Sequence, residues 1–401
     1  MRLTRIVVAG ASVAILAGCG QATVPSSHPA APAPLPPPRP VSAQVARATA
    51  GSDAAFGGAL YGRLPRAGNA VISPLSVGTA LQMALAGARG RTASQMRHAL
   101  HLAPTQPLAS VIPNAGKAEL HISNNLWLRP DTDVLASYSR SLGDTFGARP
   151  RTVDFSTDRA RRTINATVSA ETKGKISELF PRGSLDPSTI LALTNAVYLK
   201  AAWAYPFHSS SQAPFHRANR STVTADMMPL TGALGYLKRP GYQAVQLPYA
   251  GSKLAMTVLL PTGSLAPLEK RLATGGLTDL LTGIRPQALH LDMPKFTFRT
   301  NVELNKPLQD LGMRDAFDST ANFDGMVPKG GLFISTVEHQ AYIKVDEHGT
   351  EAAAATGVGV GAGAAAPPST SVTLDRPFLF AITDTTTGAP LFLGRVADPT
   401  D

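Results

Sequence analysis

The segment Glu347-His-Gly-Thr-Glu-Ala-Ala-Ala-Ala-Thr356 decides how the fold of this chain is interpreted. Its alanine run has a high helix propensity, but it leads into Gly357-Val-Gly-Val-Gly361, and each glycine weakens a helix by about 1 kcal/mol. After Glu351 the segment carries no charge and consists of small side chains. Taken alone, these residues indicate only an exposed, flexible loop, and the surrounding sequence is needed to say more.

Hydrophobic spacing on either side of this segment predicts an α+β fold. Apolar residues at helical spacing dominate the first half of the chain, and short β-rich runs dominate the second, which indicates a largely antiparallel sheet. The expected helices are 53–64, 76–85, 157–172 and 302–311. The expected strands are 120–128, 192–201, 244–248, 254–260, 289–300, 333–345, 372–374, 378–384 and 391–396.

Composition excludes several classes of protein. The chain has 401 residues, of which 44% are hydrophobic and 16% charged, as in globular proteins. Four of its 37 basic residues lie in 1–50, where no acid occurs, so the remainder carries 33 basic and 27 acidic residues. Because that surplus is small, we expect no nucleic-acid partner. The single cysteine, Cys19, excludes disulfides within the chain and cysteine-rich zinc sites.

The N-terminus is typical of an export signal. Two arginines precede the run 6–18, whose 13 apolar and small residues are too few to cross a hydrocarbon core of ~30 Å as a helix. The run ends in Leu16-Ala-Gly-Cys19, which resembles the bacterial lipobox. That resemblance implies cleavage before Cys19 and lipidation of its thiol. The alternative is an ordinary signal peptide with a chance cysteine.

The residues after Cys19 are expected to form a tether. Eight prolines lie between Pro25 and Pro40, and such a stretch neither donates regular backbone hydrogen bonds nor buries a core. We therefore expect three parts. These are a signal peptide at 1–18, a lipidated, proline-rich tether at 19–50 and a folded domain at 51–401. The protein would be exported and lipid-anchored to the bacterial cell envelope, facing outside the cytoplasm.

Motifs of catalysis are missing from the sequence. It holds no GxSxG, SxxK, HExxH or P-loop, and its nine histidines show no metal-binding spacing. Ser73 or Ser76 with His339 would be an imaginable hydrolase pair, but a buried hydrogen-bonded cluster is the favoured interpretation. The arginines within 159–162 are interpreted as a solvated helix face, with a polyanion site as the alternative. We expect no enzyme activity, no cofactor and no metal.

Several separated motifs, in the correct order, resemble those of the serpin family of serine protease inhibitors across 51–401. The motifs are Asn69-Ala-Val-Ile-Ser-Pro-Leu-Ser76, Thr194-Asn-Ala-Val-Tyr-Leu-Lys-Ala-Ala-Trp203 with Pro206-Phe207, Met293-Pro-Lys-Phe296, His339-Gln-Ala through Glu347 to Thr356, Val372-Thr-Leu-Asp-Arg-Pro-Phe-Leu-Phe-Ala-Ile382 and Pro390-Leu-Phe-Leu-Gly394. The resemblance implies the serpin fold, an α+β fold of three β-sheets with about nine helices. It also implies an exposed reactive-centre loop at about 347–372.

The resemblance further implies that the protein is an irreversible suicide substrate of a serine protease. The protease cleaves the loop and forms an acyl-enzyme, and the freed loop inserts into the main sheet before the ester is hydrolysed. The hinge of this loop would consist of Glu347, Gly349, Thr350, Glu351, Ala352, Ala353, Ala354, Ala355 and Thr356. If Thr350 faces the interior, strand alternation places Glu351 in water.

Counting along the family pattern places the reactive bond between Gly363 and Ala364. The window around it holds Gly361, Ala362, Ala365 and Ala366. These small residues predict a protease with a small specificity pocket, elastase-like or subtilisin-like. Glycine weakens a strand, so a non-inhibitory serpin-fold binding protein on the cell surface stays as the alternative. The short helix expected within 103–117 is nearly uncharged, so we expect no heparin activation.

The resemblance finally implies two gates in the main sheet. One is a salt bridge between Glu347 and Lys295 beside Trp203, and the other is a hydrogen-bonded cluster under the strands that have to part. The residues assigned to the gates are Asn69, Ser73, Ser76, Asn195, Trp203, Lys295 and His339. Buried polar residues are normally paired whatever their function. The expected partner is a serine protease, bound as a covalent acyl complex to a monomeric inhibitor.

Overall fold

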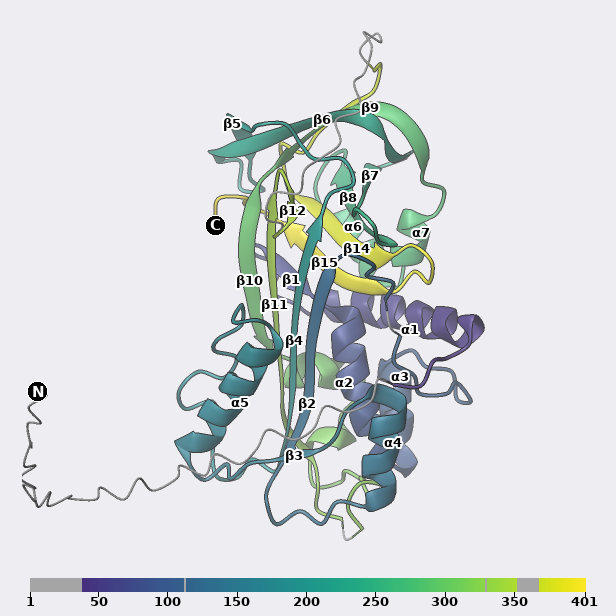
Figure 1. Cartoon of the computed structure of the whole chain (residues 1–401), viewed down its shortest axis with the longest axis vertical. Helices are drawn as coiled ribbons and strands as arrows, with labels where there is room; N and C mark the ends of the chain where they lie inside the picture. Colours follow the sequence, from purple (N-terminus) through teal and green to yellow (C-terminus); the bar gives the residue numbers. More distant parts are fainter. Residues whose placement is uncertain (1–37, 112, 329, 352–367) are drawn as a thin grey trace, which may run out of the picture. The chain divides into compact units, whose positions relative to one another are not determined.

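The computed structural model describes residues 38–111, 113–328, 330–351 and 368–401, which Figure 1 draws in colour. All of them lie in the unit Leu35–Asp401. The expected signal peptide, Cys19 and the reactive bond fall outside the described residues. Among the helices that are described, none is both long and apolar enough to cross a bilayer.

The sheet that carries the functional features has six strands in the order β10-β11-β12-β4-β2-β3. They are β2 (Glu119–Leu128), β3 (Arg151–Thr152), β4 (Leu191–Ala202), β10 (Phe296–Glu303), β11 (Ile334–Asp346) and β12 (Gly349–Thr350). β4 is buried along almost its whole length, which is why its sequence is a continuous apolar run rather than an alternating one. β4 and β11 are parallel to each other, and the short β12 is antiparallel to both.

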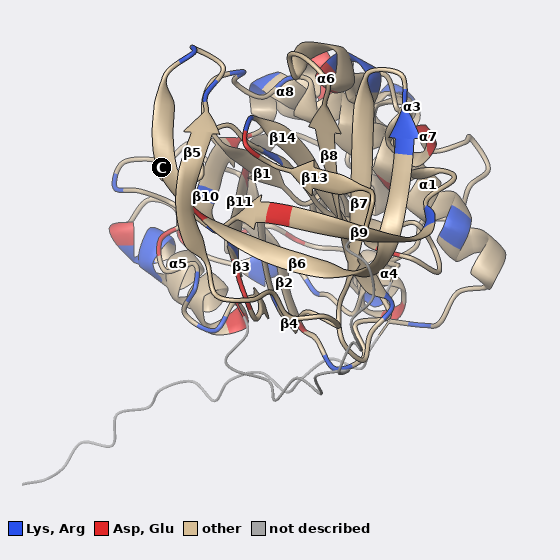
Figure 2. Ribbon diagram, turned by 90° about the horizontal axis from the view of Figure 1, so that it is seen from above, with Lys and Arg blue, Asp and Glu red and all other residues tan. Residues whose placement is uncertain are grey.

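A second, nine-stranded sheet packs behind the first. Its strands are β1 (Ala70–Ile72), β5 (Ser211–His216), β6 (Thr222–Arg239), β7 (Tyr242–Pro248), β8 (Leu254–Pro261), β9 (Arg285–Pro294), β13 (Ser371–Thr373), β14 (Phe378–Asp384) and β15 (Pro390–Val396). The long β6 pairs with β9 over Met227–Tyr236 and with β7 over Gly235–Arg239. Two of the three expected sheets are therefore continuous through β6. Figure 2 shows β6, β9 and β13 crossing the upper end of the molecule.

Eight α-helices and one 3-10 helix occur among the described residues, in agreement with the expected number. They are α1 (Ala43–Tyr61), α2 (Pro74–Gly87), α3 (Gly90–Ala99), α4 (Ala136–Phe146), α5 (Asp158–Glu171), α6 (Ala266–Ala273), α7 (Leu277–Leu281), α8 (Asn305–Asp310) and η1 (Asp315–Phe317). α2 contacts β2 and β4 of one sheet and β15 of the other, so it lies between them. α5 lies against the opposite face of the six-stranded sheet (Figure 1).

The side chains of β4 alternate between these two faces. Ala192 and Ala196 pack against Ile164 of α5. Val197 and Leu199 join the core that fills the space between the two sheets. Because strand residues alternate, the even-numbered residues of β4 point to the α5 side and the odd-numbered ones to the side of α2 and the second sheet.

Two expectations about the N-terminal half are wrong. The tether does not extend to residue 50, because α1 begins at Ala43 and the hydroxyl of Ser42 accepts the N–H of Val45 at its N-terminus. Residues 43–50 therefore belong to the folded unit. The expected helix within 103–117 is also wrong, since the described residues of that segment are irregular. Its three prolines each lack the amide hydrogen that a helix needs.

The run 289–300 is not one strand, as expected, but parts of two. β9 ends at Pro294 and β10 begins at Phe296, and the two strands belong to different sheets. Between them the N–H of Lys295 donates to the carbonyl of Asp226 at 2.9 Å. The helix expected at 302–311 is correspondingly shorter, because β10 continues through Glu303.

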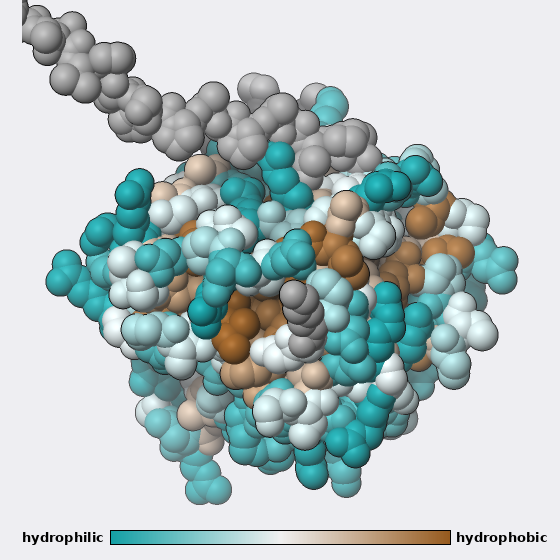
Figure 3. Space-filling view, turned by 90° about the horizontal axis from the view of Figure 1, so that it is seen from below, coloured by the Kyte–Doolittle hydropathy of each residue, from teal (hydrophilic) through white to brown (hydrophobic). Residues whose placement is uncertain are grey.

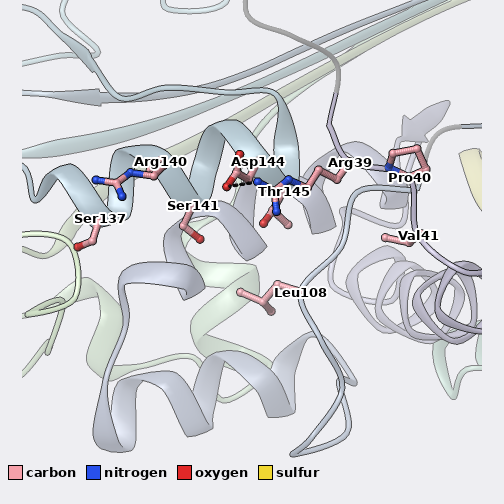
Figure 4. Close-up of a pocket in the computed structure, with 9 residues that line it drawn as sticks. All are labelled: Arg39, Pro40, Val41, Leu108, Ser137, Arg140, Ser141, Asp144 and Thr145. Carbon is pink, nitrogen blue, oxygen red and sulfur yellow. Dashed lines mark ion pairs between the residues drawn. The ribbon is translucent and has the colours of Figure 1, made fainter.

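The described chain begins beside α4. The N–H of Arg39 donates to the carbonyl of Asp144 at 2.9 Å, and their side chains form an ion pair at 3.0 Å. Figure 4 shows this pair at the edge of a cavity of about 430 Å³ that is also lined by Leu108, Ser137 and Arg140. Both ends of the ion pair are largely exposed, so it adds little stability.

Candidate functional site

The candidate site is the place where β4 and β11 part. Below this point the two strands pair directly, from Leu191 opposite Ile334 to Val197 opposite Ala341. Above it β12 lies between them, with Thr350 opposite both Val345 of β11 and Ala201 of β4. Gly349 and Thr350, at the start of the expected loop insertion, thus already form a short strand of the sheet.

Glycine is the only residue type that fits at position 349 in β12. A Cβ atom built on it would lie 2.0 Å from the carbonyl oxygen of Ala201, well inside van der Waals contact. The next residue, Thr350, is 2% exposed, and its hydroxyl lies 2.6 Å from that of Tyr249. A small residue followed by a small polar residue therefore allows the chain to enter between two strands.

Trp203 organises the upper end of this opening. Its backbone N–H donates to the carbonyl of His348 and its indole N–H to the carbonyl of Asp346, both at 2.9 Å. The indole stacks on Tyr249 with ring centroids 4.6 Å apart and meets Phe207 edge-on at 6.0 Å. Trp203 thus fixes the turn between β11 and β12. Sequence reasoning missed Tyr249, because its position 46 residues along the chain gave no local signal.

The structure brings Lys295 and Glu347 together at the same end, with Nζ and Oε1 2.5 Å apart. Partial burial opposes ionisation of Glu347, but hydrogen bonds to its carboxylate, above all from Lys295, and the charge of Lys295 together outweigh it, so the pKa of Glu347 is lowered. The pair links the β9–β10 connection to the chain just before β12. Its partners lie 52 positions apart in the sequence, and the family resemblance was what linked them.

Alternation predicted that Glu351 faces water, but in this structure it does not. Its side chain is 12% exposed, and its carboxylate forms an ion pair with Lys175 in the connection between α5 and β4. The reason is its backbone, which leaves the extended conformation with a φ of 51°. The remaining hinge residues, Ala352 to Ala355 and Thr356, lie outside the described residues.

A second group of predicted residues meets under the six-stranded sheet. Asn195 of β4 lies directly opposite His339 of β11, and its amide oxygen is hydrogen-bonded to Nδ1 of that histidine. The amide nitrogen of Asn195 donates to the hydroxyl of Ser76 at 2.5 Å and to Asn124 of β2. The N–H of Ser73 donates to Nε2 of His339 at 3.1 Å. The cluster therefore joins three strands to the start of α2, and Asn124 is a member that sequence reasoning missed.

The hydrogen bonds fix the state of His339. Because Nε2 accepts a backbone N–H, the ring proton resides on Nδ1 and the imidazole is neutral. Burial lowers the pKa of His339 to about 3. His339, Asn195 and Ser76 are all fully buried, so no substrate reaches them. The geometry thus favours the hydrogen-bonded cluster over a hydrolase pair.

Asn69 does not belong to this cluster, although it was assigned to the gates. Its side chain donates to the carbonyl of Asp398 at 2.7 Å and accepts the N–H groups of Ala397 and Asp398. It therefore holds the C-terminal segment against β1. Asn69 begins the motif that contains Ser73 and Ser76, and the sequence interpretation therefore assigned all three residues to the gates.

The arginines of α5 are mostly paired with acids. Arg161 contacts Asp158 at 2.7 Å and Glu178 at 3.4 Å, and Arg162 also pairs with Asp158. These acids offset the positive charge that a polyanion would need. The solvated, internally paired helix face is the interpretation that the structure favours.

A cavity lies beside the lower end of β4 and β11. Its volume is about 360 Å³, and it is lined by Ile190, just before β4, and by Leu332, just before β11. Val327 adds to its apolar wall. Figure 3 shows hydrophobic residues at the surface of this end, seen from below. The strands stay joined beside this cavity, because the N–H of Ile190 donates to the hydroxyl of Ser335 in β11 at 2.9 Å, so β4 and β11 part at their upper end.

The sequence of this chain was compared with those of known proteins and protein families. Residues 52–399 match the family described as Serpin (serine protease inhibitor). The chain is 37% identical over 358 residues to a bovine leukocyte elastase inhibitor, with 83% of this chain and 94% of the relative covered. It is 34% identical over 367 residues to human Serpin B11, with 82% and 93% covered.

Solved structures agree with these relatives, and they confirm the expected fold. Tengpin, a thermophilic serpin in its native state, superimposes with a TM-score of 0.80 at 27% identity, covering 90% of this chain and 96% of tengpin. Human thyroxine-binding globulin superimposes with a TM-score of 0.81 at 26% identity, covering 89% and 100%. With matched sequence, matched topology and the parted strands at β12, this chain belongs to the serpin family.

Proposed function

We propose that the protein is an irreversible suicide-substrate inhibitor of serine proteases with small-residue specificity, elastase-like or subtilisin-like. It inactivates its target by loop cleavage and loop insertion into the six-stranded sheet. The observation that carries the proposal is β12, whose residues Gly349 and Thr350 already pair between β4 and β11. The protein itself would be no enzyme and need no cofactor.

The topology favours further insertion. Direct pairing of β4 with β11 is parallel, and a strand that continues β12 would replace this one parallel ladder by two antiparallel ladders. Antiparallel ladders are slightly more stable per residue. Past the seven residue pairs between Leu191 and Val197, insertion would add about seven hydrogen bonds net of those lost. At about 0.5–1.5 kcal/mol per bond, this would release about 4–10 kcal/mol.

Target specificity is argued from the loop sequence. The proposed reactive bond, Gly363–Ala364, and its window offer only glycine and alanine to a protease. The name of the bovine relative, leukocyte elastase inhibitor, fits a target with a small specificity pocket. The alternative is a non-inhibitory serpin-fold binding protein on the cell surface. It is favoured by the loop glycines and by the likeness to thyroxine-binding globulin.

Cys19 is proposed to carry a lipid after removal of residues 1–18. The support is the sequence alone, in which the only cysteine follows Leu-Ala-Gly and a short apolar run. The inhibitor would then be held at the bacterial cell envelope, outside the cytoplasm, by the segment that ends at Ser42. The folded unit would act as a monomer.

The test is a panel of proteases with mass determination of the products. Pancreatic elastase and subtilisin are expected to form a complex that survives boiling in detergent, with release of a C-terminal peptide beginning near Ala364. Trypsin and chymotrypsin serve as controls and should give no complex through this bond. If every protease cleaves the loop and remains active at any ratio of inhibitor, the inhibitory proposal is wrong and the binding protein takes its place.

A further inference from the structure

Glu351 is the residue at which pairing of the hinge with the sheet stops. Its N–H still donates to the carbonyl of Lys344 in β11 at 3.1 Å. Its φ of 51° lies in the left-handed region, which residues other than glycine, asparagine and aspartate rarely adopt. The ladder that begins at Gly349 and Thr350 thus ends in a sharp turn at Glu351.

An ion pair holds this turn. The carboxylate of Glu351 contacts Nζ of Lys175, whose ammonium also lies 5.8 Å from the centre of the Tyr198 ring. The hydrogen bond to Glu351 raises the pKa of Lys175 above its ordinary value. The Glu351 side chain is 12% exposed and that of Lys175 is 39% exposed, so the pair is shielded from solvent on the Glu351 side. It is therefore worth more than a pair at an open surface.

Lys175 is itself fixed by the connection in which it lies. Its N–H donates to the carbonyl of Thr172 at 3.1 Å, at the end of α5, and the next side chain, Ile176, is buried with Leu179 in the core under α5. The ion pair therefore ties the hinge to the helix that covers the face of the sheet.

We propose that the Lys175–Glu351 pair is a latch that holds the hinge at its turn and slows entry of the loop into the sheet. This inference rests on the proposed function and assigns Lys175 as a positioning residue. For the strand to grow past Thr350, φ of Glu351 must change from the left-handed to the extended region. That rotation about the N–Cα bond carries Cβ with it. It re-aims the carboxylate while Lys175 stays in place, so the pair breaks as insertion proceeds.

The chain offers a matched control in Lys173. It lies in the same connection, is exposed, and has no ion pair among the described residues. Lys173→Met removes the same charge two positions away and leaves Glu351 with its partner. Lys175→Met and Glu351→Gln each remove the latch. The double exchange Lys175→Glu with Glu351→Lys restores opposite charges in reversed order.

The test measures loop insertion without a protease. The full chain is warmed below its unfolding temperature, and conversion to the inserted form is followed by mobility in urea-gradient gels and by tryptophan fluorescence. Lys175→Met and Glu351→Gln are expected to convert about fivefold faster than the unaltered protein, and Lys173→Met at the unaltered rate. Added salt should accelerate the unaltered protein towards the two single variants, and it should leave those variants unchanged. The double exchange should recover part of the slow rate.

The latch is refuted if Lys175→Met and Lys173→Met convert at one rate, or if salt acts on both alike. If no form converts before it unfolds, the fraction of elastase trapped rather than released is compared instead. A latch then requires a larger trapped fraction for Lys175→Met than for Lys173→Met, and equal fractions refute it. Failure of the proposed function gives a different result, because then even the unaltered protein traps no protease. The latch can still be tested in that case, since the rates of conversion of the variants can still be compared.

Discussion

Replacing Thr350 by arginine should turn this inhibitor into a substrate. Thr350 is 2% exposed, and its hydroxyl bonds to that of Tyr249 inside the opening between β4 and β11. An arginine at this position has no room for its side chain and would bury its charge without a partner. The hinge of the variant would therefore leave β12 in the uncleaved protein, and insertion would have to bring this side chain back into the sheet as its first step.

The magnitude follows from the burial. An unpaired buried charge costs several kcal/mol. If about 3 kcal/mol of that cost is felt in the transition state of insertion, the rate falls about 100-fold, because each 1.4 kcal/mol is a factor of ten. Cleavage of the loop is a separate step and should be unaffected. The acyl-enzyme would therefore be hydrolysed before it is trapped.

The assay counts inhibitor molecules consumed per elastase or subtilisin molecule inactivated, together with the amount of detergent-stable complex. Thr350→Arg should show rapid cleavage and no complex, whereas the control Thr350→Ser, which keeps the hydroxyl, should inhibit normally. A melting curve of each variant checks that the native fold is intact. The reasoning fails if the arginine variant traps protease as efficiently as the serine variant.

Three further predictions concern single residues. Gly349→Ala places a Cβ against the carbonyl of Ala201 and should lower the melting temperature in calorimetry by several degrees; an unchanged midpoint would contradict the close fit. Burial lowers the pKa of His339 from 6.5 to about 3, so the fold favours the neutral ring, and stability falls by up to about 1.4 kcal/mol per pH unit as pH drops below 6.5. Urea unfolding of His339→Gln between about pH 4 and pH 7 should lack this contribution, and the same pH slope in both proteins would disprove it. Cys19→Ala should abolish labelling by palmitate and release the protein from membranes, and labelling that persists would exclude lipidation of the thiol.

The pH experiment needs the comparison of two proteins because another buried group acts in the opposite sense. Burial, and next the nearby Glu303, raise the pKa of Glu338 from 4.5 to about 7. A carboxyl group with a raised pKa stabilises the fold at low pH and loses that contribution as pH rises through 7. Between pH 4.5 and 6.5 the two slopes partly cancel. The difference between His339→Gln and the unaltered protein isolates the histidine.

The sequence predicted those parts of the fold that have a local pattern. β2, β4 and β11 were located to within two residues. The nearly continuous apolar run of β4 and the partial alternation of β2 are both visible without a structure. β6 was not predicted, since its 18 residues mix buried and exposed positions where it passes from one set of neighbours to another. Its alternation is therefore interrupted along its length.

Contacts in the site were predictable only where the family resemblance supplied them. Lys295 and Glu347 were paired correctly on that basis, but Asn124 and Lys175 were missed. Asn124 lies 71 positions from Asn195, and only the alignment of β2 with β4 brings them together. Lys175 meets Glu351 because a single residue adopts a left-handed conformation, and nothing in an alanine-rich segment signals that turn.

The register of β4 and β11 suggests that the buried cluster controls the rate of insertion more than its outcome. His339 and Asn195 are directly opposite each other, so a strand inserted between them would about double the separation of their backbones, from about 4.8 Å to about 9.6 Å. Their hydrogen bond cannot survive that change. Leaving the two groups unpaired costs about 1–3 kcal/mol each. That cost lasts until Thr356, which the continued register of β12 would place opposite both groups, offers its hydroxyl as a partner. This cost, about 2–6 kcal/mol for both groups, is about half of the net gain of about 4–10 kcal/mol from the new ladders, and it is incurred before the lower part of the strand has formed. The cluster thus keeps the uncleaved protein from inserting its loop prematurely without preventing insertion after cleavage. Asn195→Ala should accordingly shorten the lifetime of the active form on warming and leave the covalent complex with elastase intact; a longer lifetime would show that the cluster does not hold the strands together.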